Sequence, residues 1–487
     1  MGVIINQTLK NTIYTYLGFG IGAINVLFLF TNFMTDEYYG LIGYLLSVAN
    51  IMMPLLCFGV QNTLIKFFSF YADEDEKNKF TTLMFFLPIV IIIPVGIIGV
   101  VGYNTIVGFL SKENAIVSDY VWTIYLLAIT MAYFEVFYAW SKAHMKSVYG
   151  NFLKEVFNRL ATMLMLFLLF FKILTIHQFI VGIVLINLIR MIMMGLSAYW
   201  VKKPKFKFSL PSNTKSVMKY SLLIVLAGSI AVMLLDIDKV MIGQFKIISN
   251  VAFYNVAIFM AMVIVVPSRS MHQITYPLTA KLMNEKNMKD LAILYKKSSL
   301  TLYIIGGLIF LFIILNVDEL YRILPEQYSG GVLVVLFISI AKLSENLAGN
   351  NNSIIFNSNY YRVVLLFGVL LVLLTIGLNI IFIPLWGITG AAAATLTAFL
   401  SYSILKIYFV WKKFQIHPFS KPTLYVSLIL ILFLGVFYFW NFSFHPIINI
   451  VLKSIIIGIL YLFLIIKLNL SEDITSIFLK YTKLKNP

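Results

Sequence analysis

The sequence has little of what secreted domains and metalloenzymes depend on. Its single cysteine, Cys57, excludes an internal disulfide framework. Charged residues make up only 12% of the 487 residues, roughly half of their share in a soluble domain. No two of the five histidines have the spacing of metal ligands. We therefore expect no disulfide-stabilised fold, no metal site and no cofactor.

Apolar residues, in contrast, make up 61% of the chain, well above the roughly 45–50% of a soluble domain. A bilayer core about 30 Å thick is crossed by roughly 20 apolar residues of helix. Fourteen stretches of about this size follow one another, and the fifth is the shortest. The sequence therefore predicts an all-α, polytopic membrane protein with about 14 transmembrane helices. The stretches are 12–34, 39–60, 80–103, 119–140, 156–171, 177–200, 216–235, 250–268, 299–316, 329–350, 361–382, 387–411, 423–440 and 447–466.

The basic residues alternate along the chain. Of the 37 lysines and arginines, 29 lie at the two termini or in every second gap, whereas five lie in the opposite gaps. Because cytosolic loops carry an excess of lysine and arginine, both termini are expected in the cytosol. The net charge of +17 does not indicate nucleic acid, since the basic residues form short clusters beside apolar stretches and no binding stripe.

The two halves of the chain resemble each other. Tyr39 and Lys66 bound the second stretch as Tyr254 and Lys281 bound the eighth, 215 residues later. The repeated halves run in the same direction through the membrane, which suits a transporter with a central cavity between two lobes. We expect an N-lobe of six helices, a cytosolic linker, a C-lobe of six helices, and two further helices with a cytosolic tail. Their ranges are 1–200, 201–215, 216–411 and 412–487.

Three segments resemble signature helices of bacterial polysaccharide flippases. EYYGLIGYLLSVANIMMPLLCFGVQNTLIKFF (37–68) resembles the second helix, FYNVAIFMAMVIVVPSRSMHQITYPLTAKL (253–282) the eighth, and GITGAAAATLTAFLSYSILKIYFV (387–410) the twelfth. The chain is thus similar to O-antigen-type flippases of the multidrug/oligosaccharidyl-lipid/polysaccharide exporter superfamily.

The resemblance implies a transporter and not an enzyme. Such a protein moves an undecaprenyl-pyrophosphate-linked oligosaccharide from the cytosolic to the periplasmic leaflet by alternating access. The implied partners are this lipid-linked oligosaccharide, membrane lipid and, as candidates, the glycan polymerase and assembly machinery. No nucleic acid is expected, and the protein is expected to be a monomer.

Charged residues inside apolar stretches are the first candidates for substrate contact, because an Arg or Lys at the centre of a span costs ~2.5–3.5 kcal/mol. Arg190 lies in the middle of the sixth stretch and either contacts a phosphate or sugar or bonds to helix carbonyls. Lys342 can pair with Glu345 one helical turn later, and Glu135 occupies the matching place in the other half. There are two interpretations of these carboxylates. Either they take up protons or arrange the cavity during the transport cycle, or they lie near the cytosolic ends of their stretches and reach water.

Four cations at cytosolic ends of stretches are further candidates. They form either a positive mouth for a pyrophosphate or ordinary positive-inside anchors. These residues are Lys66, Arg159, Arg269 and Arg362.

Three charged residues are expected at the outer side. Asp236 and Asp238 are expected in a solvated turn after the seventh stretch, with a gate or a salt bridge as alternatives. Lys453 is expected to reach the outer interface at the start of the last stretch.

The main alternative function is a cation-coupled multidrug antiporter of the same superfamily. Its familiar carboxylate in the first helix is missing, since 12–34 holds no acidic residue. A membrane polysaccharide polymerase is disfavoured because the outer gaps are short, and an acyltransferase because no intramembrane His lies with an acid.

Overall fold

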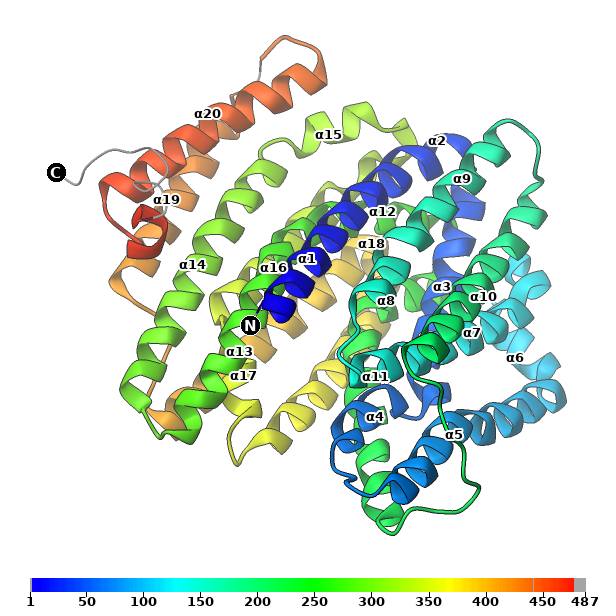
Figure 1. The fold of residues 1–487 in the computed structure, drawn as a ribbon. Coiled ribbons are helices and arrows are strands. Elements are labelled where there is room, and N and C mark those ends of the chain that lie inside the picture. Colours follow the sequence, from blue (N-terminus) through cyan, green and yellow to red (C-terminus); the bar gives the residue numbers. More distant parts are fainter. Residues whose placement is uncertain (1, 441, 477–487) are drawn as a thin grey trace. The chain divides into compact units, whose positions relative to one another are not determined.

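The computed structural model describes residues 2–440 and 442–476, and within these residues every regular element is a helix. The chain forms two compact units, Met1–Asn255 (unit 1) and Val256–Pro487 (unit 2), which are described separately below. Figure 1 shows the path of the helices along the chain. The prediction of an all-α fold is confirmed.

Ten helices among the described residues are long and apolar enough to cross a membrane. One of them, Arg362–Phe414, is broken at Gly387 and contains the eleventh and twelfth predicted stretches. The fifth stretch lies in a continuous helical segment from Val148 to Phe170, the seventh in Thr214–Phe245 and the thirteenth in the shorter Lys421–Phe437. All fourteen predicted stretches are therefore helical, which confirms the polytopic membrane fold.

Unit 1 is built around α7, which packs between α3 and α10 and also contacts α4 and α5. Helix α1 packs against α8 and the π-helical turn η3. The helices of this unit are α1 (Gly2–Ala23), η1 (Ile24–Leu29), α2 (Phe30–Phe33), α3 (Asp36–Cys57), α4 (Val60–Phe68), α5 (Glu74–Val101), α6 (Tyr103–Leu110), η2 (Ala115–Tyr120), α7 (Val121–Ala143), α8 (Val148–Phe152), η3 (Leu153–Phe157), α9 (Asn158–Phe170), α10 (Ile176–Val201) and α11 (Thr214–Phe245), and α12 (Ser249–Met262) begins in it.

Glycine breaks the second span where α3 meets α4. Phe58 and Gly59 both have positive φ, of 49° and 69°. A Cβ atom at Gly59 would lie 2.6 Å from the carbonyl oxygen of Ser221, so α11 approaches too closely for any other residue. The break lets α4 change direction while it stays packed on α11.

Helix α11 is bonded to α3 and α4 along its length. Ser47 and Asn50 donate to the Asp236 carboxylate at 2.9 and 3.1 Å, and the Thr63 and Ser221 hydroxyls lie 2.9 Å apart. This seventh span is therefore part of unit 1 in this structure. The lobe boundary at 201–215 stays a prediction.

Unit 2 has α16 at its centre, packed against α14 and α18. Helices α14, α19 and α20 lie side by side (Figure 1). The remaining helices are η4 (Val263–Val265), α13 (Val266–Asn284), α14 (Met288–Ile314), α15 (Val317–Ile323), η5 (Glu326–Gly331), α16 (Val332–Ala348), α17 (Asn351–Phe356), α18 (Tyr361–Phe414), α19 (Lys421–Phe437) and α20 (Pro446–Lys467).

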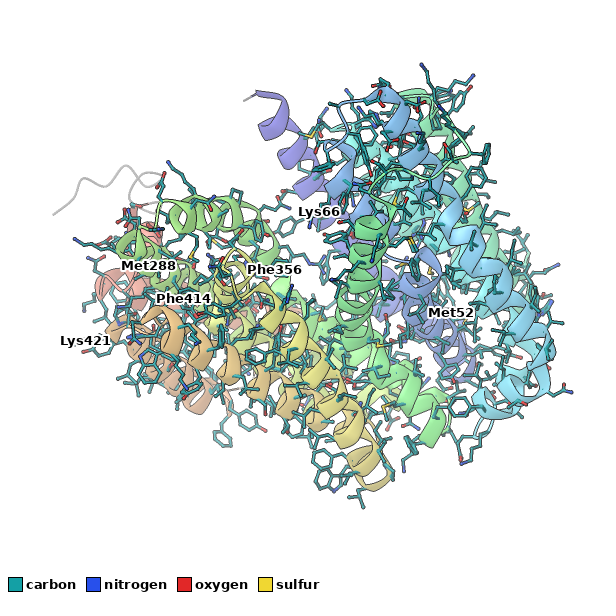
Figure 2. The ribbon with its side chains drawn as sticks, turned by 90° about the horizontal axis from the view of Figure 1, so that it is seen from below. Met52, Lys66, Met288, Phe356, Phe414 and Lys421 are labelled. Carbon is teal, nitrogen blue, oxygen red and sulfur yellow. The ribbon has the colours of Figure 1, made fainter. Side chains whose placement is uncertain are left out.

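Many large apolar side chains project outward from these helices, as the sticks in Figure 2 show. At the end of α5, Val100 and Val101 are 78% and 85% exposed. A water-soluble protein does not leave such continuous apolar surface uncovered, whereas lipid covers it at no cost.

Candidate functional site

Two charged clusters lie within the helices, one in each unit. The unit 1 cluster consists of Glu135, Lys142, Lys154, Glu155 and Arg190. The unit 2 cluster consists of His272, Lys342, Glu345, Asn352 and Lys406. Both contain residues predicted from the sequence, and both carry their predicted carboxylate on the central helix of the unit, Glu135 on α7 and Glu345 on α16.

Arg190 of α10 is 8% exposed, and its guanidinium carbon lies 4.4 Å from the centre of the Phe134 ring. Its Nε is buried and has no hydrogen-bond partner. Glu135 and Glu155 are the carboxylates that act on its charge, but neither forms a salt bridge with it within 4 Å. A buried guanidinium with unused donor capacity is costly unless an anion or polar group completes it.

Glu135 is held by a lysine from the next span. The Lys154 ammonium donates to its carboxylate at 2.5 Å, and Lys142 lies 3.7 Å above the Tyr138 ring on the same helix. The expectation that Glu135 reaches water through its span end is therefore too simple, because its side chain is only 12% exposed and is paired. With three cations and two carboxylates, the unit 1 cluster has an excess of positive charge.

The close packing of α8 on α7 brings Lys154 to Glu135. A Cβ atom at Gly150 would lie 2.2 Å from the Tyr138 ring, so only glycine allows this approach. Phe134, Tyr138, Leu153 and Met194 form the buried apolar cluster around which these charges are placed.

In unit 2, the Lys342 ammonium donates to Glu345 at 3.2 Å and lies 4.1 Å above the Phe399 ring of α18. The predicted pair is thus present. Lys342 is 6% exposed, whereas the Glu345 side chain is 43% exposed. The lysine is the buried partner and the carboxylate remains accessible.

Lys406 is a cluster member that was not among the candidates from the sequence. The positive-inside rule explains a lysine near a span end as a cytosolic anchor, but Lys406 is 2% exposed inside α18. Its ammonium lies 3.9 Å above the Tyr402 ring, donates to Asn352 at 3.2 Å, and interacts electrostatically with Glu345. The available signal was Tyr402 one turn earlier within an apolar stretch, since a lysine can bury itself on such a ring.

The corner between α16 and α17 positions Asn352 for this contact. Gly349 has a φ of 55°, and a Cβ atom there would lie 2.8 Å from the Cβ of Ser299. Asn350 donates to Thr279, and Ser299 donates to the Leu347 carbonyl at 2.5 Å. His272 of α13 completes the cluster through electrostatic interactions with Glu345 and Lys406.

The four predicted mouth cations divide between the units. In unit 1, Lys66 is exposed at the end of α4 (Figure 2) and lies 3.9 Å above the Tyr220 ring, while Arg159 pairs with Glu155 at 3.0 Å. In unit 2, Arg269 and Arg362 are both exposed, on α13 and at the start of α18. Their role in a common mouth stays a prediction.

The outer residues differ from expectation. Asp236 and Asp238 lie inside α11 and are 6% and 3% exposed, so the predicted solvated turn is wrong. The salt-bridge alternative holds for Asp236, which accepts from Lys239 at 2.7 Å. Lys453 is 3% exposed and interacts electrostatically with Glu319, so it is buried within unit 2. Among the described residues, no group of three or more His, Cys, Asp or Glu is placed to hold a metal ion.

The clusters resemble neither a nucleophilic nor a metal-dependent active site. What they offer are buried cations on aromatic rings beside carboxylates, an arrangement able to hold an anionic group away from water.

Comparisons with known proteins identify the family and the fold of the chain. A family model described as "Polysaccharide biosynthesis protein" matches residues 8–283, more than half of the chain. No curated protein matches the sequence. The fold is similar to that of the lipid II flippase MurJ in an inward closed conformation, with a TM-score of 0.71 and 14% identity over 98% of this chain and 100% of that one.

Two multidrug transporters are also similar. An inward-facing MATE family transporter of the MOP superfamily has a TM-score of 0.55 and 13% identity over 90% of this chain and 96% of that one. The MATE multidrug transporter DinF-BH has a TM-score of 0.54 and 15% identity over 85% of this chain and 95% of that one. At these identities the similarities establish the fold alone. Together with the family match, they confirm the superfamily that the three signature segments indicate: the chain belongs to the polysaccharide biosynthesis protein family and has the fold of MOP superfamily transporters.

Proposed function

We propose that this protein flips an undecaprenyl-pyrophosphate-linked oligosaccharide from the cytosolic to the periplasmic leaflet of the bacterial inner membrane. The protein works as a monomer with both termini in the cytosol, and it changes accessibility without forming or breaking a covalent bond. The lipid-linked oligosaccharide is its substrate, and the glycan polymerase and assembly machinery receive the product.

The observation that carries this proposal is the state of Arg190. Its guanidinium is buried on Phe134, and its Nε has no partner. A pyrophosphate supplies the acceptor oxygens and the negative charge that this group lacks. Lys142 and Lys154 are close enough to Glu135 to act in the same cluster.

The unit 2 cluster has the same excess of cations. Lys342 and Lys406 face one carboxylate, Glu345, and both ammonium groups lie on aromatic rings. Lys342 and Lys406 contact a phosphate during the cycle, and Glu345 competes with that phosphate for them. The anionic headgroup is first attracted at the cytosolic side by four cations, Lys66, Arg159, Arg269 and Arg362. Long-range attraction of this kind depends on the charge of the residues more than on their exact geometry.

The competing function is a cation-coupled multidrug antiporter. Glu135 and Glu345 are the residues that such an antiporter would use, because a cationic drug needs a carboxylate. The balance of charge opposes this choice, since cations outnumber carboxylates in both clusters, and the first span (Lys10–Phe33) contains no acidic residue.

Reconstitution in liposomes separates the two functions. The probes are an undecaprenyl-pyrophosphoryl disaccharide with a fluorescent label, and a lipophilic cationic dye. Flipping of the labelled glycolipid, measured by its accessibility to a membrane-impermeant quencher, with loss on Arg190→Met, supports the proposal. Uptake of the dye driven by an ion gradient, with no movement of the glycolipid, refutes it in favour of the antiporter.

A further inference from the structure

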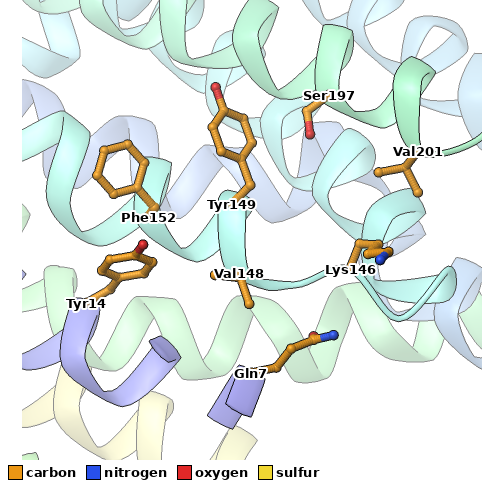
Figure 3. A pocket seen from close by; sticks show the side chains of 8 residues that line it. All are labelled: Gln7, Tyr14, Lys146, Val148, Tyr149, Phe152, Ser197 and Val201. Atoms are coloured by element: carbon orange, nitrogen blue, oxygen red, sulfur yellow. The ribbon is translucent and has the colours of Figure 1, made fainter. Parts of the chain in front are cut away.

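A groove of about 490 Å³ lies where one end of α1 meets α8 and the end of α10, all in unit 1 (Figure 3). None of the unit 1 cluster residues lines it. Its lining includes Gln7, Tyr14, Lys146, Tyr149, Phe152 and Ser197. The groove is therefore a separate feature that the proposed transport cycle does not use.

Polar and aromatic residues are segregated along the groove. Figure 3 shows the amide of Gln7 and the ammonium of Lys146 on one side and the rings of Tyr14 and Phe152 on the other. Tyr14 follows Gln7 by seven residues, which places it about 10 Å further along α1. The Tyr14 and Phe152 rings meet edge to face at 5.4 Å, and Tyr149 stacks beside Phe152 at 6.4 Å.

The polar end of the groove coincides with the basic end of the helices. Gln7 is near the start of α1, Lys146 lies two residues before α8, and α10 ends at Val201 just before Lys202 and Lys203. In the proposed orientation this end lies at the cytosolic surface, and Tyr14 and Phe152 lie deeper in the cytosolic leaflet. A cationic rim above an aromatic, apolar floor matches the polarity of an inner-leaflet lipid.

We propose that the groove binds one anionic glycerophospholipid of the cytosolic leaflet. Its phosphate accepts from Lys146 and Gln7, and an acyl chain lies along Tyr14, Tyr149 and Phe152. The proposal rests on the proposed orientation for the choice of leaflet, but it is independent of what the protein transports.

The lipid would lie between helices that side-chain hydrogen bonds already connect. The cytosolic end of α1 is held on the α7–α8 corner by Gln7 donating to the Met145 carbonyl at 2.9 Å and by Asn11 donating to Ser147 at 3.0 Å. Phe152 also packs against the apolar cluster that contains Phe134, the ring beneath Arg190. A bound lipid thus stabilises α1 and the support of the Arg190 site together.

The test measures lipid binding to the purified full chain in neutral detergent, by native mass spectrometry and thermal unfolding. Phosphatidylglycerol is compared with phosphatidylcholine, so that the two lipids differ in headgroup charge. We expect phosphatidylglycerol to raise the unfolding temperature more than phosphatidylcholine does. Lys146→Gln should weaken its binding about fivefold, the equivalent of the ~1 kcal/mol that a lysine contributes beside an anionic lipid.

A second variant and a matched control make the outcome specific. Ser197→Trp fills the groove from α10 and should abolish the difference between the two lipids without changing any charge. Lys281→Gln removes another exposed cation, in unit 2, and should leave binding unchanged. Equal stabilisation by both lipids, or wild-type binding in Lys146→Gln and Ser197→Trp, overturns the proposal.

Undecaprenyl phosphate is the third ligand tested. If it displaces phosphatidylglycerol and shows the same dependence on Lys146 and Ser197, the groove is a substrate-tail site and the phospholipid proposal is wrong. Failure of the labelled glycolipid to flip in liposomes would refute the proposed function but would leave these binding results unchanged, so the two failures are distinguishable.

Discussion

Replacing Arg190 with methionine should abolish transport while leaving the fold as stable as before. The guanidinium gains about 2 kcal/mol from the Phe134 ring, together with attraction to Glu135 and Glu155. Against this stand ~2.5–3.5 kcal/mol for a charge inside the membrane and about 1–3 kcal/mol for the unpaired buried Nε. Glu135 keeps its Lys154 partner in the variant. We therefore expect unfolding free energy within about 2 kcal/mol of wild type, on the stabilised side.

Transport should respond very differently. A charge-assisted bond to a phosphate is worth about 1.5–3 kcal/mol, so glycolipid flipping per folded molecule should fall roughly 10- to 100-fold. Arg190→Lys should retain part of the rate, because it keeps the charge but loses the planar donors. The control is Lys453→Met, another buried cation, which lies in neither cluster and should not slow flipping; Glu319 keeps its Arg322 partner in this variant. Normal flipping by Arg190→Met, or a loss explained by unfolding, would refute the role of Arg190.

Three further changes have defined outcomes. Lys406→Gln keeps a donor near Asn352 but removes the charge, so flipping should fall about tenfold while denaturant unfolding stays near wild type; unchanged flipping argues against a phosphate contact. Lys112→Cys should react with an impermeant maleimide in intact cells and Lys205→Cys only after permeabilisation, with buried Cys57 as a silent background; the reverse pattern inverts the topology. Glu135→Gln should tighten glycolipid binding and slow its release, measured as separate equilibrium and rate constants; weaker binding contradicts competition by the carboxylate.

The positions of the apolar helices were predictable because hydrocarbon thickness acts on each helix independently. About twenty apolar residues in a row suffice to identify a span, whatever surrounds it. Hydropathy alone does not predict the burial of a charged residue when its hydrogen-bond partners come from a helix that is remote in sequence. Asp236 near the end of an apolar stretch indicated a solvated turn, but Ser47 and Asn50 of α3 supply its hydrogen bonds from within the protein.

Lys406 shows the same limit for cations. The positive-inside rule treats a lysine near a span end as an anchor in the cytosol, and for most lysines that treatment is adequate. Burial of Lys406 depends on Tyr402 from its own helix and on Asn352 from α17, which only the Gly349 corner brings into range. Arg190, Lys342, Glu135 and Glu345 were candidates because they lie inside apolar stretches, although for the two carboxylates the sequence left open that they lie near the cytosol and reach water.

In the proposed transport cycle, the carboxylates of both clusters control how the phosphate of the substrate is released. A phosphate bound by Arg190, Lys142 and Lys154 alone would gain every charge-assisted bond and would dissociate slowly. Glu135 already holds Lys154 at 2.5 Å, so the phosphate must displace it on binding and loses to it on release. Glu345 likewise accepts a hydrogen bond from Lys342 at 3.2 Å, and the phosphate must displace it in the same way. Each carboxylate thereby lowers the affinity of the protein for the bound substrate. The cations remain in place to compensate the charge of the pyrophosphate as it crosses the membrane. Rapid turnover requires both.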